Sequence, residues 1–190
     1  MTLLILGLVL FLGTHSISII SWRWRDGMVA KFGEIPFKAV YSLLAIAGLV
    51  LIVIGYGQAR MEPTWLYQPP AFLRHLSMLL MLFVFPALLA AYFPGRIQRA
   101  LGHPMLVAVK AWALAHLLVN GTLADVLLFG GFLVWAVVDR ISFKHRPERA
   151  IPQLPATRAN DIIVIVGGLA LYVAFTFWLH PVLFGVPVIG

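Results

Sequence analysis

Two histidines lie deep inside apolar stretches of the sequence, and they carry its most specific chemical signal. His15 follows the run Leu-Ile-Leu-Gly-Leu-Val-Leu-Phe-Leu-Gly-Thr, and His116 lies well inside the apolar run that begins at Pro104. Polar residues inside a membrane are costly and usually face the protein interior. A lone histidine there is most often a hydrogen-bonded packing residue. Two on different segments, with no carboxylate at similar depth, favour a shared ligand over a proton relay.

The ligand that suits two neutral imidazoles best is haem iron. Imidazoles that face each other across a helix bundle can bind a transition metal or a haem. A divalent ion with only two neutral ligands would be poorly compensated, whereas a porphyrin brings its own charge and four nitrogens. The sequence contains no cysteine, which excludes thiolate ligands, disulfides and a cysteine nucleophile. We therefore predict haem, with its iron held by His15 and His116, and assign no catalytic residue.

Other residues near these histidines extend the candidate cofactor-binding set. Gly13 and Ser16 beside His15, and Ala113 before His116, are small enough to let a flat cofactor approach the backbone. Trp112 precedes His116 by four residues and shares its helical face, so it can stack on the macrocycle, although core packing explains it equally well. Haem propionates need cations or hydrogen-bond donors. The candidate cations are Lys110, which can equally snorkel to the interface, Arg74, Arg96 and Arg99. His75 and His103 complete the predicted cofactor-binding set, with their roles left open.

The composition places the whole chain in a membrane. Its 190 residues are 62% hydrophobic and only 11% charged, and the mean hydropathy is +0.96. A soluble domain of this length needs more polar residues to cover its surface. The formal charge of +7 does not indicate nucleic-acid binding, because the basic residues lie in short loops between apolar segments, the pattern that encodes membrane topology. The lipid bilayer is the first predicted partner.

Six membrane spans are predicted from the rule that about 20 apolar residues cross the hydrocarbon core. The fold class is therefore all-α, a polytopic transmembrane helix bundle, organised as a single domain over residues 1–190. The first span lacks a basic leader and a small-residue cleavage site, so we expect it to remain in the mature protein. The predicted spans are Thr2–Ser21, Phe37–Tyr56, Leu73–Tyr92, Met105–Val119, Leu123–Val138 and Ile162–Leu179.

The basic residues also predict the orientation. Most of them lie in the loops after spans one, three and five, whereas the loop after span two holds only Arg60 and Arg74. Lysine and arginine accumulate on the cytoplasmic side of membrane proteins. The odd-numbered loops are therefore expected in the cytoplasm, and both termini outside it.

Several sequence blocks resemble the NnrU family. They are Leu-Phe-Leu-Gly-Thr-His15-Ser16, Gly55-Tyr-Gly-Gln-Ala-Arg60, Pro94-Gly-Arg-Ile97, His103-Pro-Met-Leu with Trp112-Ala-Leu-Ala-His116, and Leu128-Phe-Gly-Gly-Phe-Leu-Val-Trp-Ala-Val-Val-Asp139-Arg140. The resemblance covers nearly the whole chain. It implies a multi-pass protein of the bacterial cytoplasmic (inner) membrane, associated with nitrite and nitric oxide reduction (denitrification). It also implies a redox partner or a nitrogen-oxide reductase system as a partner.

The NnrU family is in turn similar to 15-cis-ζ-carotene isomerase, a haem b membrane enzyme of plants and cyanobacteria. Similar blocks in that enzyme carry its two axial haem histidines, and carried over by motif these are His15 and His116. Where the isomerase has a cysteine thought to exchange with an iron ligand, this chain has Ala113. The resemblance therefore implies the haem pocket rather than the isomerase chemistry.

Three functions follow as hypotheses. The first is a bis-histidine haem b protein that supports nitrogen-oxide metabolism by electron transfer, sensing or assembly. The second is a haem-dependent cis–trans isomerase of a carotenoid-like apolar small molecule, for which an aromatic lining is available: Phe83, Phe85, Phe129, Phe132 and Trp135. The third is a cofactor-free structural or transport protein. Transport is disfavoured because no span is broken in mid-membrane, although Pro86 is expected to kink span three.

Overall fold

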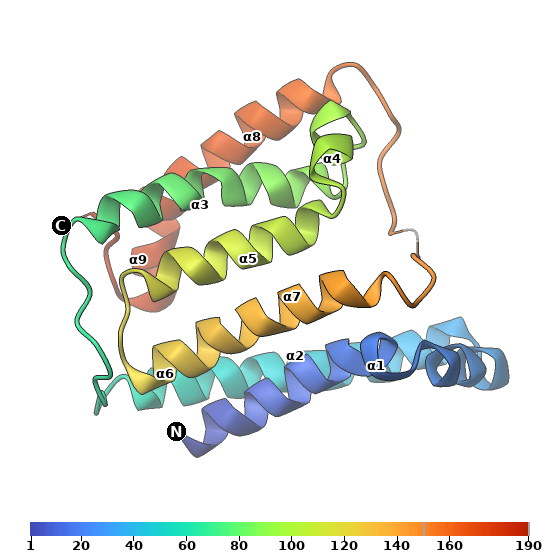
Figure 1. Ribbon diagram of the computed structural model, residues 1–190, viewed down its shortest axis with the longest axis horizontal. Coiled ribbons are helices and arrows are strands. Elements are labelled where there is room, and N and C mark those ends of the chain that lie inside the picture. The colour runs from blue at the N-terminus through green and yellow to red at the C-terminus, as the bar shows by residue number, and fades with distance from the viewer. Residues whose placement is uncertain (150, 190) are drawn as a thin grey trace. The chain divides into compact units, whose positions relative to one another are not determined.

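The computed structural model describes residues 1–149 and 151–189, and helices dominate this part of the chain (Figure 1). Its described residues form no β-strand, and their one isolated β-bridge joins Trp65 and Thr122. The helices, with two π-helical segments labelled η, are α1 (Thr2–Phe32), α2 (Glu34–Ala59), α3 (Leu73–Ala90), α4 (Arg96–Leu101), α5 (Pro104–Leu117), α6 (Leu123–Asp125), η1 (Val126–Gly130), α7 (Gly131–Ser142), α8 (Asn160–Ala174), η2 (Phe175–Leu179) and α9 (His180–Phe184).

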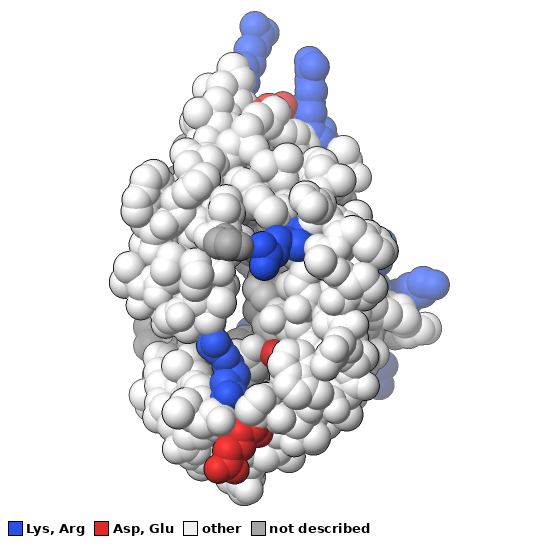
Figure 2. Space-filling model, turned by 90° about the vertical axis from the view of Figure 1, so that its left-hand side faces the viewer, with Lys and Arg blue, Asp and Glu red and all other residues white. Residues whose placement is uncertain are grey.

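Four described helical segments are long and apolar enough to cross a membrane, which confirms the prediction of an all-helical, membrane-type chain. They are Thr2–Phe32, Glu34–Ala59, Leu73–Ala90 and Asn160–Phe184. Large apolar side chains are exposed on them, among them Ile20 and Ile35, and most of the surface seen in Figure 2 is uncharged. Helix α5 is shorter, with 14 residues. The run from α6 to α7 contains Asp125, Asp139 and Arg140, so the count of six spans stays a prediction.

Helix α1 is interrupted where the first span was predicted to end. Ser21 has φ −153° and ψ 82°, outside the helical region, and the helix resumes from Trp22 to Phe32. Only Gly33 then separates α1 from α2, and its φ of 90° is a conformation that suits glycine because there is no Cβ to clash. The predicted loop after span one is therefore mostly helical, because its residues have no Pro to stop a helix before Pro36.

The described chain divides into two compact units, each built from two stretches of sequence. Unit 1 comprises Met1–Pro70 and Val119–Glu148, and unit 2 comprises Ala71–Leu118 and Arg149–Gly190. Unit 1 contains α1, α2, α6, η1 and α7, and unit 2 contains α3, α4, α5, α8, η2 and α9. The single domain predicted over residues 1–190 stays a prediction.

Unit 1 rests on a close antiparallel crossing of α1 and α2. A Cβ added at Gly7 would lie 2.5 Å from the Ile52 nitrogen, and one at Gly48 would lie 2.7 Å from the Phe11 nitrogen. Small residues that let two backbones approach are the usual device for helix packing in membranes. The glycines on the facing sides of α1 and α2 therefore set how tightly these two apolar helices pack.

A matched pair of glycines in α2 tests this packing. At Gly55 an added Cβ would overlap the backbone of Leu3 and Leu4, whereas at Gly57 no heavy atom lies within 4 Å. Both Gly→Ala changes gain similar helix propensity, so their difference isolates the overlap. We expect Gly55→Ala to lower the free energy of unfolding by about 1–3 kcal/mol relative to Gly57→Ala. Denaturation in detergent, followed by circular dichroism, measures it, and equal stability of the two variants would contradict it.

Unit 2 is organised around α3, which contacts both α5 and α8. Val84 and Ala87 of α3 and Ala108 of α5 form its buried cluster. Helix α3 continues through Pro86, and a Cβ at Gly168 of α8 would lie 2.6 Å from the Pro86 ring and nitrogen. The glycine thus gives the bulky proline ring room against the neighbouring helix.

Candidate functional site

His15 is a half-buried residue of α1 with a ring held by one hydrogen bond. Its Nδ1 lies 2.7 Å from the Phe11 carbonyl oxygen, one turn earlier. A carbonyl can only accept, so Nδ1 carries the proton and donates it, which leaves the lone pair of the neutral ring on Nε2. A backbone hydrogen bond of this kind fixes the tautomer of most metal-binding histidines. His15 is therefore prepared for a ligand at Nε2.

Aromatic rings from three helices surround His15. Phe11 stacks on it with ring centroids 4.2 Å apart, while Tyr41 of α2 and Trp135 of α7 meet it edge-on at 5.4 Å and 6.0 Å. The sequence named Trp135 only as an aromatic lining residue and did not identify Tyr41. Helical spacing alone finds Phe11, because residues four apart share a face. The two other rings reach His15 only through packing between helices.

The indole nitrogen of Trp135 is buried and has no hydrogen-bond partner within the described part of the chain. Buried donors are nearly always paired, so an unpaired one marks a place for a water or a ligand acceptor atom. This donor belongs to a ring beside His15. The neighbourhood of His15 therefore combines a nitrogen lone pair with an unused N–H group.

His116 of α5 repeats the arrangement in unit 2. Its Nδ1 lies 2.8 Å from the Trp112 carbonyl oxygen, which again places the proton on Nδ1 and the lone pair on Nε2. The Trp112 and His116 ring centroids are 5.3 Å apart, with the planes tilted by 52°. Trp112 also packs against the cluster of Val84, Ala87 and Ala108. It therefore serves the core of unit 2, whatever else it contacts.

The remaining candidates lie in unit 2 at different degrees of exposure. Lys110 of α5 is half-buried, Arg74 and His75 near the start of α3 are exposed, and His103 precedes the first residue of α5. The Nδ1 of His75 faces the Phe72 carbonyl oxygen at 3.3 Å. His15 and its neighbours Gly13 and Ser16 belong to unit 1. The structure thus brings Trp112 and His116 together, and the pairing of His15 with His116 stays a prediction.

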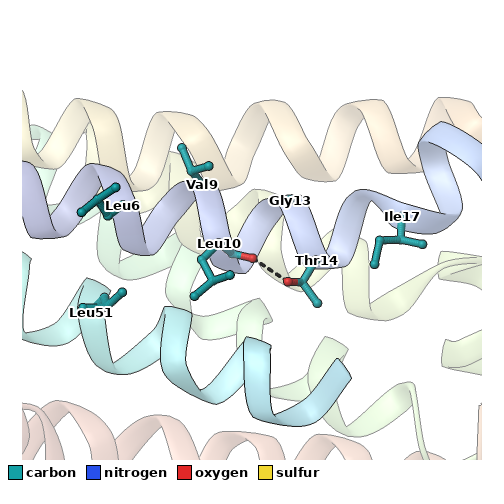
Figure 3. A pocket seen from close by; sticks show the side chains of 7 residues that line it. All are labelled: Leu6, Val9, Leu10, Gly13, Thr14, Ile17 and Leu51. Atoms are coloured by element: carbon teal, nitrogen blue, oxygen red, sulfur yellow. Dashed lines mark hydrogen bonds between the residues drawn. The ribbon is translucent and has the colours of Figure 1, made fainter. Parts of the chain in front are cut away.

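A hollow beside Gly13 lies between α1 and α2, and Figure 3 shows its lining. It has a volume of about 520 Å³ and is lined by Leu6, Val9, Leu10, Gly13, Thr14, Ile17 and Leu51. The Thr14 hydroxyl donates to the Leu10 carbonyl at 2.6 Å, so this polar group is already satisfied. His15 does not line the hollow. Gly13 therefore opens space on α1, but not on the face that carries the histidine.

The carboxylates near the span ends have structural partners. Asp125 accepts from Thr122 and Tyr56, Asp139 accepts from Arg146, and Asp161 accepts from the first backbone N–H groups of α4. Tyr67 lies near Asp125, and its pKa is raised, first by burial and then by the negative charge of Asp125. Tyr67 therefore stays protonated and donates to the Asn120 carbonyl at 2.7 Å. Each of these acids therefore holds neighbouring donors in place.

Bare metal ions find few ligands in the described residues. No group of three or more His, Cys, Asp or Glu there can hold a metal ion.

The four long apolar helical segments define a helical membrane protein. The NnrU family model, described as NnrU protein, matches residues 3–188, and the chain belongs to this family. The match confirms the resemblance found in the sequence. No curated protein matches the chain, and no solved structure does.

Proposed function

We propose that the chain binds haem b in the membrane, with His15 and His116 as the iron ligands, and that it supports nitrogen-oxide metabolism by electron transfer, sensing or assembly. The observation that carries this proposal is the shared state of the two histidines. Each lies in an apolar helix, and each donates Nδ1–H to the carbonyl of the residue four positions earlier. Each therefore presents Nε2, the nitrogen of a neutral imidazole that binds a metal.

Haem supplies an iron that exchanges one electron and binds small gases such as nitric oxide. The chain's own residues set the environment of that iron. The carbonyls of Phe11 and Trp112 orient the imidazoles and make Nε2 a better electron donor. Phe11, Tyr41 and Trp135 exclude water from one side of His15. Arg74 and Lys110 are the cations proposed to meet the propionates.

The proposed setting is the bacterial cytoplasmic membrane, crossed six times with both termini outside the cytoplasm. The distribution of basic residues supports this orientation. A redox partner or a nitrogen-oxide reductase system is the proposed partner, and family membership supports it. Ala113 replaces the cysteine that the isomerase mechanism requires, which favours this role over isomerisation.

Replacement of single histidines tests the ligand assignment. We expect His15→Ala and His116→Ala each to lower the haem content of the purified protein by roughly tenfold or more, since each removes a bond to iron. His145→Ala, at an exposed position after α7, and His180→Ala are the controls. His180 is the stricter one, because its Nδ1 also faces a carbonyl, that of Val186 at 2.7 Å.

The readout is the pyridine haemochromogen absorbance per chain, with circular dichroism to show that each variant is folded. Full haem content in both His15→Ala and His116→Ala would overturn the assignment. Loss of haem in His180→Ala, with retention in His116→Ala, would move the second ligand to the end of unit 2.

A further inference from the structure

A second hollow in unit 1 lies beyond the break in α1. It has a volume of about 350 Å³, and its walls are the resumed part of α1, the first turns of α2 and Ile17, which lies before the break. Trp24, Met28 and Phe32 line one side, and Phe37, Val40 and Leu44 line the other. The volume falls within the usual range of small-molecule pockets, about 300–1,000 Å³. The break at Ser21 and the tight connection at Gly33 create the space, because they fold the end of α1 beside α2.

The lining selects an apolar occupant. Trp24, Phe32 and Val40 are more than half exposed, at 53%, 53% and 58%. Apart from the Trp24 indole and the Tyr41 hydroxyl, the side chains of the hollow carry no hydrogen-bonding group. Burial of such surface by a hydrocarbon chain is favourable by about 25 cal/mol per Å².

Positive charge lies against the rings of this lining. The Lys31 ammonium is 5.2 Å from the centre of the Phe32 ring, and the Arg25 guanidinium is 5.3 Å from that of Phe37. Arg25 pairs with Asp26 at 3.0 Å. Lys31 pairs with no carboxylate of residues 1–149 and 151–189. An apolar hollow with a cation at its edge fits a molecule that joins a hydrocarbon chain to an anionic head.

We propose that this hollow, together with Lys31 and Arg25, is a binding site for an anionic phospholipid. One acyl chain occupies the space between Met28 and Val40, and the phosphate lies between the two cations. Basic residues at the membrane surface attract anionic lipids by about 1 kcal/mol each, which corresponds to about fivefold in affinity. None of the binding groups of this site is a candidate iron ligand, and the two sites share only Tyr41, which lines the hollow and contacts the His15 ring. The bound lipid would hold the resumed part of α1 against α2.

The test is native mass spectrometry of the detergent-purified full chain, titrated with palmitoyl-oleoyl phosphatidylglycerol or with phosphatidylcholine of the same chains. We expect tighter binding of phosphatidylglycerol. Lys31→Gln is expected to weaken phosphatidylglycerol binding by about fivefold and phosphatidylcholine binding by less, because the choline ammonium offsets the phosphate charge of phosphatidylcholine. Val40→Trp, which fills the hollow from an exposed position, is expected to weaken both lipids.

Two control variants separate this site from general lipid contact. Lys144→Gln removes an exposed cation from the loop after α7, and Val50→Trp enlarges an exposed side chain of α2 outside the hollow. Both are expected to leave lipid binding unchanged. Equal affinity for the two lipids, an equal loss in Lys144→Gln and Lys31→Gln, or undiminished binding in Val40→Trp would each overturn the proposal. Tighter binding of phosphatidylcholine, whose net charge is zero, than of phosphatidylglycerol would also overturn it.

Discussion

Asp125→Ala is expected to lower the free energy of unfolding by about 3–5 kcal/mol, one of the two largest effects of any single change. The Asp125 carboxylate is buried and accepts from the Thr122 backbone N–H at 2.9 Å, the Thr122 hydroxyl at 2.6 Å and the Tyr56 hydroxyl at 2.5 Å. Alanine would leave all three donors without their acceptor. Each unpaired buried donor costs about 1–3 kcal/mol.

The loss is expected to spread to the segment before α3. Thr122 and its neighbours hold that segment, since Leu66 donates to the Gly121 carbonyl at 2.8 Å and Leu123 donates to that of Thr64 at 2.8 Å. Limited proteolysis between residues 61 and 70 should therefore become faster in Asp125→Ala. Asp125→Asn is the matched control, because its amide keeps one acceptor oxygen and should lose less stability. Wild-type stability in Asp125→Ala would show that the carboxylate is not what orders this end of unit 1.

Asp139→Ala is expected to have the second large effect. It should lower the free energy of unfolding by about 3–5 kcal/mol, because it leaves the buried guanidinium of Arg146 without its partner. Arg146 donates to Asp139 at 2.6 Å, and their side chains are only 9% and 11% exposed. Arg146 also donates to the Ser142 hydroxyl at 2.8 Å and lies 4.0 Å from the centre of the Phe143 ring. The charge is therefore fixed in place and cannot easily turn to water.

A double-mutant cycle distinguishes the lost pair from lost packing. Arg146→Met removes the charge and keeps the aliphatic stem, so the double variant Asp139→Ala/Arg146→Met should recover much of the stability lost in Asp139→Ala. Denaturation in detergent provides the four stabilities. Additive losses in the double variant would mean that the pair is not coupled, in conflict with the observed geometry.

The sequence predicted the helical, membrane-type class because apolar composition and segment length are local properties. The interruption of α1 falls at Ser21, the residue at which the first span was predicted to end. The return to helix from Trp22 to Phe32 was not predicted, because the charge distribution marks a membrane boundary but not the end of a helix. The π-helical segments η1 and η2 also had no signal in the hydrophobic pattern.

In the candidate site, too, contacts within one helix could be predicted from the sequence, whereas contacts between helices could not. The hydrogen bonds from His15 to Phe11 and from His116 to Trp112 join residues four apart, so helical spacing anticipates them. The contact of His15 with Trp135 joins positions that are distant in sequence and depends on how α1 packs against α7. The sequence did not predict the partners of the buried acids either, because those contacts also depend on packing between helices. Tyr56 reaches Asp125 across unit 1, which no spacing rule predicts.

The most direct measurement of the central claim is the absorption spectrum of the detergent-purified protein, first oxidised and then reduced with dithionite. The proposal predicts a sharp reduced α-band and close to one b-type haem per chain, with a spectral change on addition of nitric oxide if a histidine ligand is displaced. A colourless protein from haem-replete cells, still unable to take up added hemin, would contradict haem binding. The structural or transport role would then be the one to pursue.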